Sequence, residues 1–244
     1  MPADIDPRPA SLVPDAATVA IVAYGELRDR VSDLLGDVTE EQAATFVPGC
    51  PAWTVTDTLA HMVGVCIDIV DGAIGDDVGT TAWADSHVTR FAGLGIPGLL
   101  ERWQETAPVI DSLAGLMADR IASQFVFDAC THEHDLRGAL GRPGARDSSS
   151  LRVGLGFVEM MLDGLIRGHD LPSLLLDLGD ECVSAGPLPT SVALTADRFD
   201  VFRAFGGRRS VEQIRAMAWT GDPTPYLEVF AASPLSPPEA ALVE

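Results

Sequence analysis

The sequence predicts a mainly helical protein in which an up-and-down four-helix bundle is followed by a small α+β domain. Four stretches carry the 3.6-residue hydrophobic repeat of amphipathic helices, and each is roughly 15–20 residues long, as in such bundles. After about residue 170, the pattern changes to short strand-like runs separated by Gly and Pro. The chain of 244 residues is long enough for one or two domains with a sizeable core.

Most of the bundle helices have a recognisable start or stop. Asp15 is a candidate N-cap for the first helix, and Thr54 is a candidate N-cap for the second. Pro108 predicts a bend in the third helix. Gly141, followed by Pro143, is a strong stop signal for the fourth. The predicted helices cover residues 15–35, 54–70, 97–118 and 123–140, and a fifth helical pattern spans about 150–167.

The remaining segments complete the predicted organisation. Residues 71–95 are glycine-rich and predict a long irregular connection, and "VPGCPAWTVTD" predicts a loop. Near the C-terminus, "SLLLDLG", "ECVSAG" and "TSVALTAD" are typical of short strands, whereas "RFDVFRAFGG" and "SVEQIRAMAW" are typical of helices. We therefore expect an irregular leader at 1–14, the bundle at 15–145, a connecting helix at 146–169, the α+β domain at 170–232 and a loose tail at 233–244.

The charge of the chain argues against two classes of partner. The formal net charge is −20, all 16 cations are Arg, and no block of basic residues occurs. Nucleic acids and anionic membranes are therefore not expected partners, because phosphate contacts need clustered cations. No apolar run reaches the ~18–20 residues that span a bilayer. The N-terminus lacks a signal-peptide pattern, so we expect a cytoplasmic protein, monomeric or homodimeric, whose four cysteines are free thiols.

The segment "DACTHEHDLRGALG" places several ionisable side chains on one helix. On a helical wheel, His132 lies at the centre of the apolar stripe, with Asp128 at its margin one turn earlier. Cys130 and His134 are expected on the opposite side, and Glu133 is expected to point sideways. An inward carboxylate and imidazole cost several kcal/mol unless they are compensated. Either a hydrogen bond between them or a shared divalent metal ion would compensate both.

A third candidate ligand lies on the second helix. In "CPAWTVTDTLAHMVG", His61 lies on the flank of the core face, from which it could reach a metal held by the fourth helix. The alternative is a boundary histidine that is hydrogen-bonded to the backbone. Asp57 is expected to complete a capping box with Thr54. Two imidazoles and one carboxylate form a typical catalytic zinc set with an open position, and the same set suits Fe(II).

Both of these segments resemble the mycothiol-dependent maleylpyruvate isomerase family, which belongs to the DinB-like metal-binding four-helix bundles. The segment "LTADRFDVFRAFGGRRSVEQIRAMAWTGDPTPYLEVF" resembles the small α+β domain of many members. The resemblance implies that His61, Asp128 and His132 bind the metal, with Asp128 where the isomerases have Glu. It also implies that mycothiol, the low-molecular-weight thiol of actinobacteria, is the thiol cosubstrate.

This resemblance predicts an S-transferase or a cis-trans isomerase. A coordinating divalent cation, Zn²⁺ or another, deprotonates a thiol at neutral pH, and the thiolate then attacks a small electrophile. Arg208 and Arg209 in "GGRRS" are candidates for binding an anionic substrate or cofactor, and we assign Arg208 a catalytic role as well. A surface position at a helix N-terminus is the alternative for both. Asp135 is a further catalytic candidate, because it could orient His132 as a hydrogen-bond acceptor.

Two other functions are also compatible with the sequence. One is a metal hydrolase that uses metal-bound hydroxide, for which Glu133 would be a poorly aimed base. The other is a non-catalytic metal-binding bundle. Cys66 and Cys130 are expected to be core residues, so the attacking thiol must come from outside. His87 and His169 are expected to be exposed, and the two tryptophans at 53 and 83 either line a pocket or pack at a bundle end.

Overall fold

The computed structural model describes residues 8–9, 16–187, 189–232 and 235–242, and its chain divides into two compact units. Residues 17–144 form one unit, which we call the helical unit. Residues 145–243, together with 1–16, form the other, which we call the C-terminal unit. Within the described residues, no helix is both long and apolar enough to cross a membrane.

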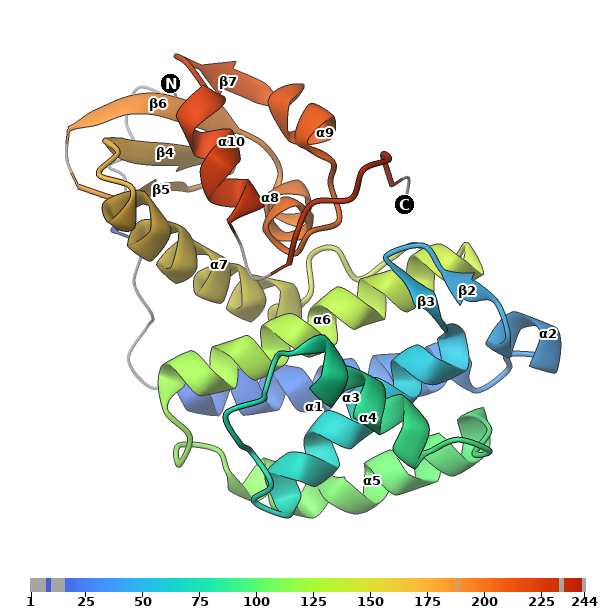
Figure 1. Ribbon diagram of the computed structural model, residues 1–244. Coiled ribbons are helices and arrows are strands. Elements are labelled where there is room, and N and C mark those ends of the chain that lie inside the picture. Colours follow the sequence, from blue (N-terminus) through green and yellow to red (C-terminus); the bar gives the residue numbers. More distant parts are fainter. Residues whose placement is uncertain (1–7, 10–15, 188, 233–234, 243–244) are drawn as a thin grey trace. The chain divides into compact units, whose positions relative to one another are not determined.

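Four long helices form the helical unit, as the hydrophobic repeats predict (Figure 1). Helix α3 packs against both α5 and α6. The predicted C-terminal ends are accurate for α1, α3 and α6, and Gly141 ends α6 in the left-handed conformation, with φ of 62°. Helix α6 begins at Asp119, four residues before the predicted start, and α5 ends at Ser112, six residues before the predicted end. The expected cap at Asp15 lies outside the described residues. The four helices are α1 (Ala16–Leu35), α3 (Val55–Val70), α5 (Ile96–Ser112) and α6 (Asp119–Leu140).

The predicted capping box at the start of α3 is confirmed. The Thr54 side chain accepts a hydrogen bond from the Asp57 backbone N–H at 3.2 Å, and the Asp57 carboxylate accepts one from the Thr54 N–H at 2.9 Å. Because these bonds satisfy backbone donors that a helix start leaves unpaired, they fix where α3 begins. The position of His61, less than two turns along the helix, follows from that start.

The prediction of an irregular connection over residues 71–95 is wrong in part. Helix α4 (Thr81–Arg90) forms there, with Thr80 as its N-cap, and packs against α3. Gly64 of α3 makes this close packing possible, because a Cβ atom at that position would lie 2.4 Å from the His87 ring. Glycine inside a helix costs roughly 1 kcal/mol relative to alanine, and here it gives α4 room to approach.

The loop expected around Trp53 instead contains a short antiparallel hairpin. Strand β2 (Phe46–Val47) pairs with β3 (Cys50–Thr54), and a single helical turn, α2 (Glu40–Ala43), precedes them. Helix α6 contacts β2. The hairpin therefore brings Cys50 and Trp53 to the part of the bundle where α3 begins.

A buried polar cluster links three helices of this unit. The Trp103 indole donates a hydrogen bond to the Tyr24 hydroxyl at 2.8 Å, and that hydroxyl lies 2.6 Å from Cys66 Sγ. Burial raises the pKa of the Cys66 thiol to about 11. Cys66 is thus a core residue, as predicted.

We expect the cysteines of the folded protein to differ in reactivity. Iodoacetamide at pH 8 should label the half-buried Cys50 and leave Cys66 unmodified, because Cys66 is inaccessible and almost wholly protonated at this pH. Peptide mass spectrometry after a short exposure measures this difference. Urea-unfolded protein, in which all four thiols should react, is the control. Equal labelling of Cys50 and Cys66 in the folded state would contradict the expectation.

The C-terminal unit is a five-stranded sheet with helices, as predicted for the α+β domain. Its strand order is β1-β5-β4-β6-β7, with β4 antiparallel to β5 and parallel to β6. Helix α7 contacts β4, β5, α8 and α10 within this unit. The elements are α7 (Ser149–Gly168), β4 (Ser173–Asp177), β5 (Cys182–Ala185), β6 (Thr190–Thr195), α8 (Arg198–Phe205), α9 (Val211–Arg215), β7 (Ala218–Thr220) and α10 (Thr224–Ala231).

Two segments of this unit differ from the expectation. The helix expected over 210–219 ends at Arg215, and the residues after it form β7 beside β6. In the leader, which was expected to be irregular, Arg8–Pro9 form β1, paired in parallel with β5. The other leader residues lie outside the described part of the chain.

Candidate metal centre

The structure brings His61, Asp128 and His132 together. His61 comes from α3, and the other two come from successive turns of α6. His61 Nε2 lies 3.7 Å from Asp128 Oδ2, and His132 Nε2 lies 3.8 Å from Asp128 Oδ1. One potential ligand atom of each residue lies within 4.8 Å of the other two. Both histidines are buried, whereas the Asp128 side chain is 39% exposed.

These separations suit a shared metal ion better than they suit hydrogen bonds. Hydrogen bonds between nitrogen and oxygen are roughly 2.7–3.2 Å long. Ligand atoms at about 2.0–2.2 Å from a tetrahedral zinc ion are roughly 3.3–3.5 Å apart. The observed 3.7 and 3.8 Å need only a small inward movement to reach that geometry. Two imidazoles and one carboxylate thus fit a divalent cation such as Zn²⁺, with a coordination position left for another ligand.

Asp135 lies where an acceptor that orients His132 is expected. Its Oδ2 atom is 3.1 Å from His132 Nδ1, and its side chain is fully buried. A carboxylate oxygen is an acceptor, so we assign the hydrogen-bonding proton to His132 Nδ1. His132 Nε2 is then unprotonated and faces Asp128.

Cys50 is a neighbour of this site that the sequence did not indicate. Its Sγ atom lies 3.6 Å from Asp135 Oδ2 and 3.9 Å from His132 Nδ1. The thiol therefore lies on the Nδ1 side of the His132 ring, away from the Nε2 atom that faces Asp128. The β2–β3 hairpin places Cys50 there, and no helical periodicity could have predicted it.

The prediction that His87 is exposed is wrong. It is fully buried, and its Nδ1 atom lies 3.1 Å from His61 Nδ1. On its other side, His87 Nε2 lies 2.8 Å from Asp68 Oδ2. Asp68 also accepts hydrogen bonds from Trp83 Nε1 at 3.0 Å and from Arg90 NH1 at 2.7 Å. Thr80 as an N-cap and a glycine inside α3 are the sequence signals that could have indicated this arrangement.

Burial and hydrogen bonds determine the protonation states of His87 and Asp68. Burial lowers the pKa of His87 and outweighs the hydrogen bond to Asp68, which acts in the opposite direction. Burial alone would raise the pKa of Asp68, but hydrogen bonds from His87 and Arg90 lower it overall. We therefore assign a neutral His87 beside an ionised Asp68 at neutral pH.

Two tryptophans pack against the histidines. The Trp53 ring lies 5.0 Å from the His61 ring and 6.0 Å from the His132 ring, measured between centroids. The Trp83 ring lies edge-on to His61 at 5.9 Å. Both tryptophans are themselves half-buried, and they pack beside the buried His61 ring.

The rest of α6 departs from the wheel prediction. His134 and Cys130, which were expected to face away from the core, are both buried, and every residue from 129 to 136 is buried. Glu133 is fully buried as well. Its carboxylate accepts hydrogen bonds from Arg30 of α1 at 2.8 and 3.1 Å and from Arg137 at 3.0 and 3.1 Å. Glu133 thus ties α6 to α1.

Arg208 and Arg209 belong to the C-terminal unit, and His169, as expected, is exposed. Both arginines are buried rather than at the surface. Arg209 donates to Asp200 Oδ1 at 2.8 and 3.1 Å, and Arg208 donates to the Gly206 carbonyl at 2.7 Å. Their expected role in binding an anion stays a prediction.

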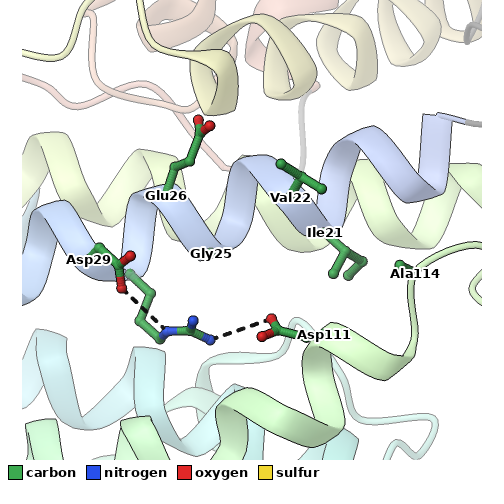
Figure 2. A pocket seen from close by; sticks show the side chains of 8 residues that line it. Ile21, Val22, Gly25, Glu26, Asp29, Asp111 and Ala114 are labelled. Carbon is green, nitrogen blue, oxygen red and sulfur yellow. Dashed lines mark ion pairs between the residues drawn. The ribbon is translucent and has the colours of Figure 1, made fainter.

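A separate pocket of about 310 Å³ lies beside α1 and the end of α5 (Figure 2). The buried Arg28 lies in it, with NH1 3.7 Å from Asp111 Oδ1 and Nε 3.9 Å from Asp29 Oδ1. No residue of the metal cluster lines this pocket. Its lining is Ile21, Val22, Gly25, Glu26, Arg28, Asp29, Asp111 and Ala114.

The fold and the cluster together define a helical-bundle protein with a candidate divalent-metal centre between two helices. Residues 24–137 match the model of the mycothiol maleylpyruvate isomerase N-terminal domain. This part of the chain is similar to that domain, in agreement with the resemblance seen in the sequence.

The fold comparison agrees with the family match. The chain resembles a crystal structure of a histidine-to-alanine variant of mycothiol-dependent maleylpyruvate isomerase, with a TM-score of 0.52 and 11% sequence identity. The match covers 79% of this chain and 88% of that one. At this identity, the likeness shows a common fold. No curated protein matches the chain.

Proposed function

We propose that this protein is a divalent-metal-dependent enzyme that activates a low-molecular-weight thiol, mycothiol, for transfer to a small electrophile or for its cis-trans isomerisation. The grouping of His61, Asp128 and His132 around a common point carries this proposal. The domain family and the fold neighbour, whose names specify mycothiol and maleylpyruvate, support the choice of thiol and of reaction class.

Each residue of the site has a separate task in this proposal. His61, Asp128 and His132 would hold the ion, and Asp135 would keep the His132 ring turned so that Nε2 faces it. A divalent cation bound there lowers the pKa of a coordinated thiol, which has an ordinary pKa of about 8.5, so that the thiolate is present at neutral pH. Trp53 and Trp83 would keep water from the His61 side of the centre.

The thiol would come from outside the chain. Cys66 is buried in the core with a pKa of about 11, and Cys50 lies on the far edge of the His132 ring. Neither sulfur lies where it could occupy the open coordination position of an ion held by His61, Asp128 and His132. Arg208 and Arg209 remain the predicted anchors for an anionic substrate or cofactor.

Hydrolysis by a metal-bound hydroxide is less well supported. That reaction needs a general base within hydrogen-bond reach of the attacking water. Glu133, which the sequence already indicated to be poorly aimed as a base, is held by Arg30 and Arg137. This engagement favours thiol activation over hydrolysis.

Thiol binding tests the proposed function. Isothermal titration of the zinc-loaded protein with mycothiol should show binding, and its S-methyl derivative should bind at least about tenfold more weakly, because a blocked sulfur cannot become a thiolate ligand. The same pair of titrations on the His132→Ala variant should show no such difference. Equal affinities of the zinc-loaded protein for the free and the blocked thiol would mean that sulfur is not a ligand, and the proposal would fail.

A further inference from the structure

We propose that His87 and Asp68 hold His61 in the tautomer that leaves its Nε2 atom free to bind a metal ion. The inference rests on the proposed function, because His61 is one of the three proposed ligands. Its basis is a buried series of contacts in which His61 Nδ1 lies 3.1 Å from His87 Nδ1 and His87 Nε2 lies 2.8 Å from Asp68 Oδ2.

The direction of these hydrogen bonds follows from Asp68. Its carboxylate already accepts from Trp83 Nε1 and Arg90 NH1, and an ionised carboxylate has no proton to donate. The contact with His87 is therefore an Nε2–H donor to Asp68. Arg90 balances the charge of Asp68, so a protonated His87 would be a second cation in a fully buried position. His87 is thus neutral, and its Nδ1 atom carries a lone pair.

The tautomer of His61 then follows. Two ring nitrogens 3.1 Å apart share one proton, and His87 Nδ1 can only accept it. His61 Nδ1 must be the donor. In a neutral imidazole, a protonated Nδ1 leaves a lone pair on Nε2, which is the atom 3.7 Å from Asp128 Oδ2. The opposite tautomer would place an N–H where the metal ion must bind.

The fold keeps His87 in this position. Gly64 leaves the space that the His87 ring occupies, and Trp83 packs edge-on against that ring at 4.5 Å between centroids. Asp135 holds His132 in the corresponding tautomer, because it accepts a hydrogen bond from His132 Nδ1. Both proposed imidazole ligands thus donate Nδ1–H to a buried acceptor and face the site with Nε2, although one acceptor is a carboxylate and the other is a histidine.

The tautomer can be measured on the unaltered protein without metal. Long-range ¹H–¹⁵N correlation spectra of ¹⁵N-histidine-labelled protein at neutral pH distinguish a protonated Nδ1 from a protonated Nε2. We expect His61 to be protonated on Nδ1 and His87 on Nε2. His61 protonated on Nε2 would overturn the proposal. This experiment uses no metal, so its failure is separate from a failure of the proposed function.

Zinc affinity tests the consequence for the site. His87→Phe keeps a ring but removes the acceptor, and we expect it to weaken zinc binding by roughly 10–100-fold in competition with a chromophoric chelator. His87→Gln, whose amide oxygen can accept from His61, should recover much of this loss. Gly64→Ala keeps all the polar groups but displaces the His87 ring, and it should weaken binding as His87→Phe does.

His169→Ala, at an exposed histidine of the C-terminal unit, should bind zinc as the unaltered protein does and is the matched control. Wild-type zinc affinity in a folded His87→Phe or Gly64→Ala variant would overturn the proposal. If His87→Phe does not fold, Gly64→Ala and the tautomer measurement decide the question. Unaltered protein that binds no zinc would refute the proposed function instead.

Discussion

His61→Ala and His132→Ala should each reduce the bound metal from about one divalent ion per chain to well below one. Each variant removes one of the three proposed ligands, and the two that remain should bind a divalent ion more weakly than three. The His132→Ala substitution has a second effect, because it also leaves the buried Asp135 without its histidine donor. Elemental analysis of protein purified without chelators measures the stoichiometry.

Two further variants are compared with the histidine-to-alanine variants. His169→Ala should retain the full metal content, because His169 is exposed and lies in the C-terminal unit. Asp128→Asn keeps the size of the side chain but removes its charge, and it should weaken binding while leaving the fold unchanged. Unchanged metal content in both His61→Ala and His132→Ala would contradict the assignment of these histidines as metal ligands.

Glu133→Ala should lower the free energy of unfolding by about 3–5 kcal/mol, the effect expected when one partner of a buried ion pair is removed. The Glu133 side chain is 0% exposed, and those of Arg30 and Arg137 are 28% and 15% exposed. Without the carboxylate, the guanidinium groups of Arg30 and Arg137 would lose the buried acceptor that they share. Urea denaturation followed by circular dichroism measures the change.

A surface ion pair of the same unit serves as the comparison. Arg102 and Glu105 lie 2.7 Å apart, but their side chains are 53% and 56% exposed. Glu105→Ala should therefore cost less than about 1 kcal/mol. If Glu133→Ala and Glu105→Ala had equal effects, the Glu133 contacts would not be what ties α6 to α1.

Much of the helical unit could be predicted from local patterns. The start of α3 depends on a capping box of two residues three positions apart, and the end of α6 depends on Gly141 in the left-handed conformation. Both are interactions within a few residues, so the sequence contains all the information that they require. The i, i+4 spacing of Asp128 and His132 is equally local and predicts that they share one side of a helix.

Helix α4 was missed because its hydrophobic repeat is weak and its flanks are rich in glycine. Its position depends on Gly64 of another helix, where the missing side chain makes room for His87. The burial of His134 and Glu133 was missed for a related reason. A helical wheel assumes one covered face, but all residues from 129 to 136 of α6 are buried.

The candidate ligand residues, the helices that carry them and the family resemblance could all be read from the amino-acid sequence, because they depend on residue identity and short spacing. The approach of His61 to Asp128, the contacts of Cys50 with His132 and Asp135, and the series from His61 through His87 to Asp68 depend on packing between segments that are distant in the chain. Such contacts are set by shape and by the pairing of buried polar groups across elements, which no single segment encodes.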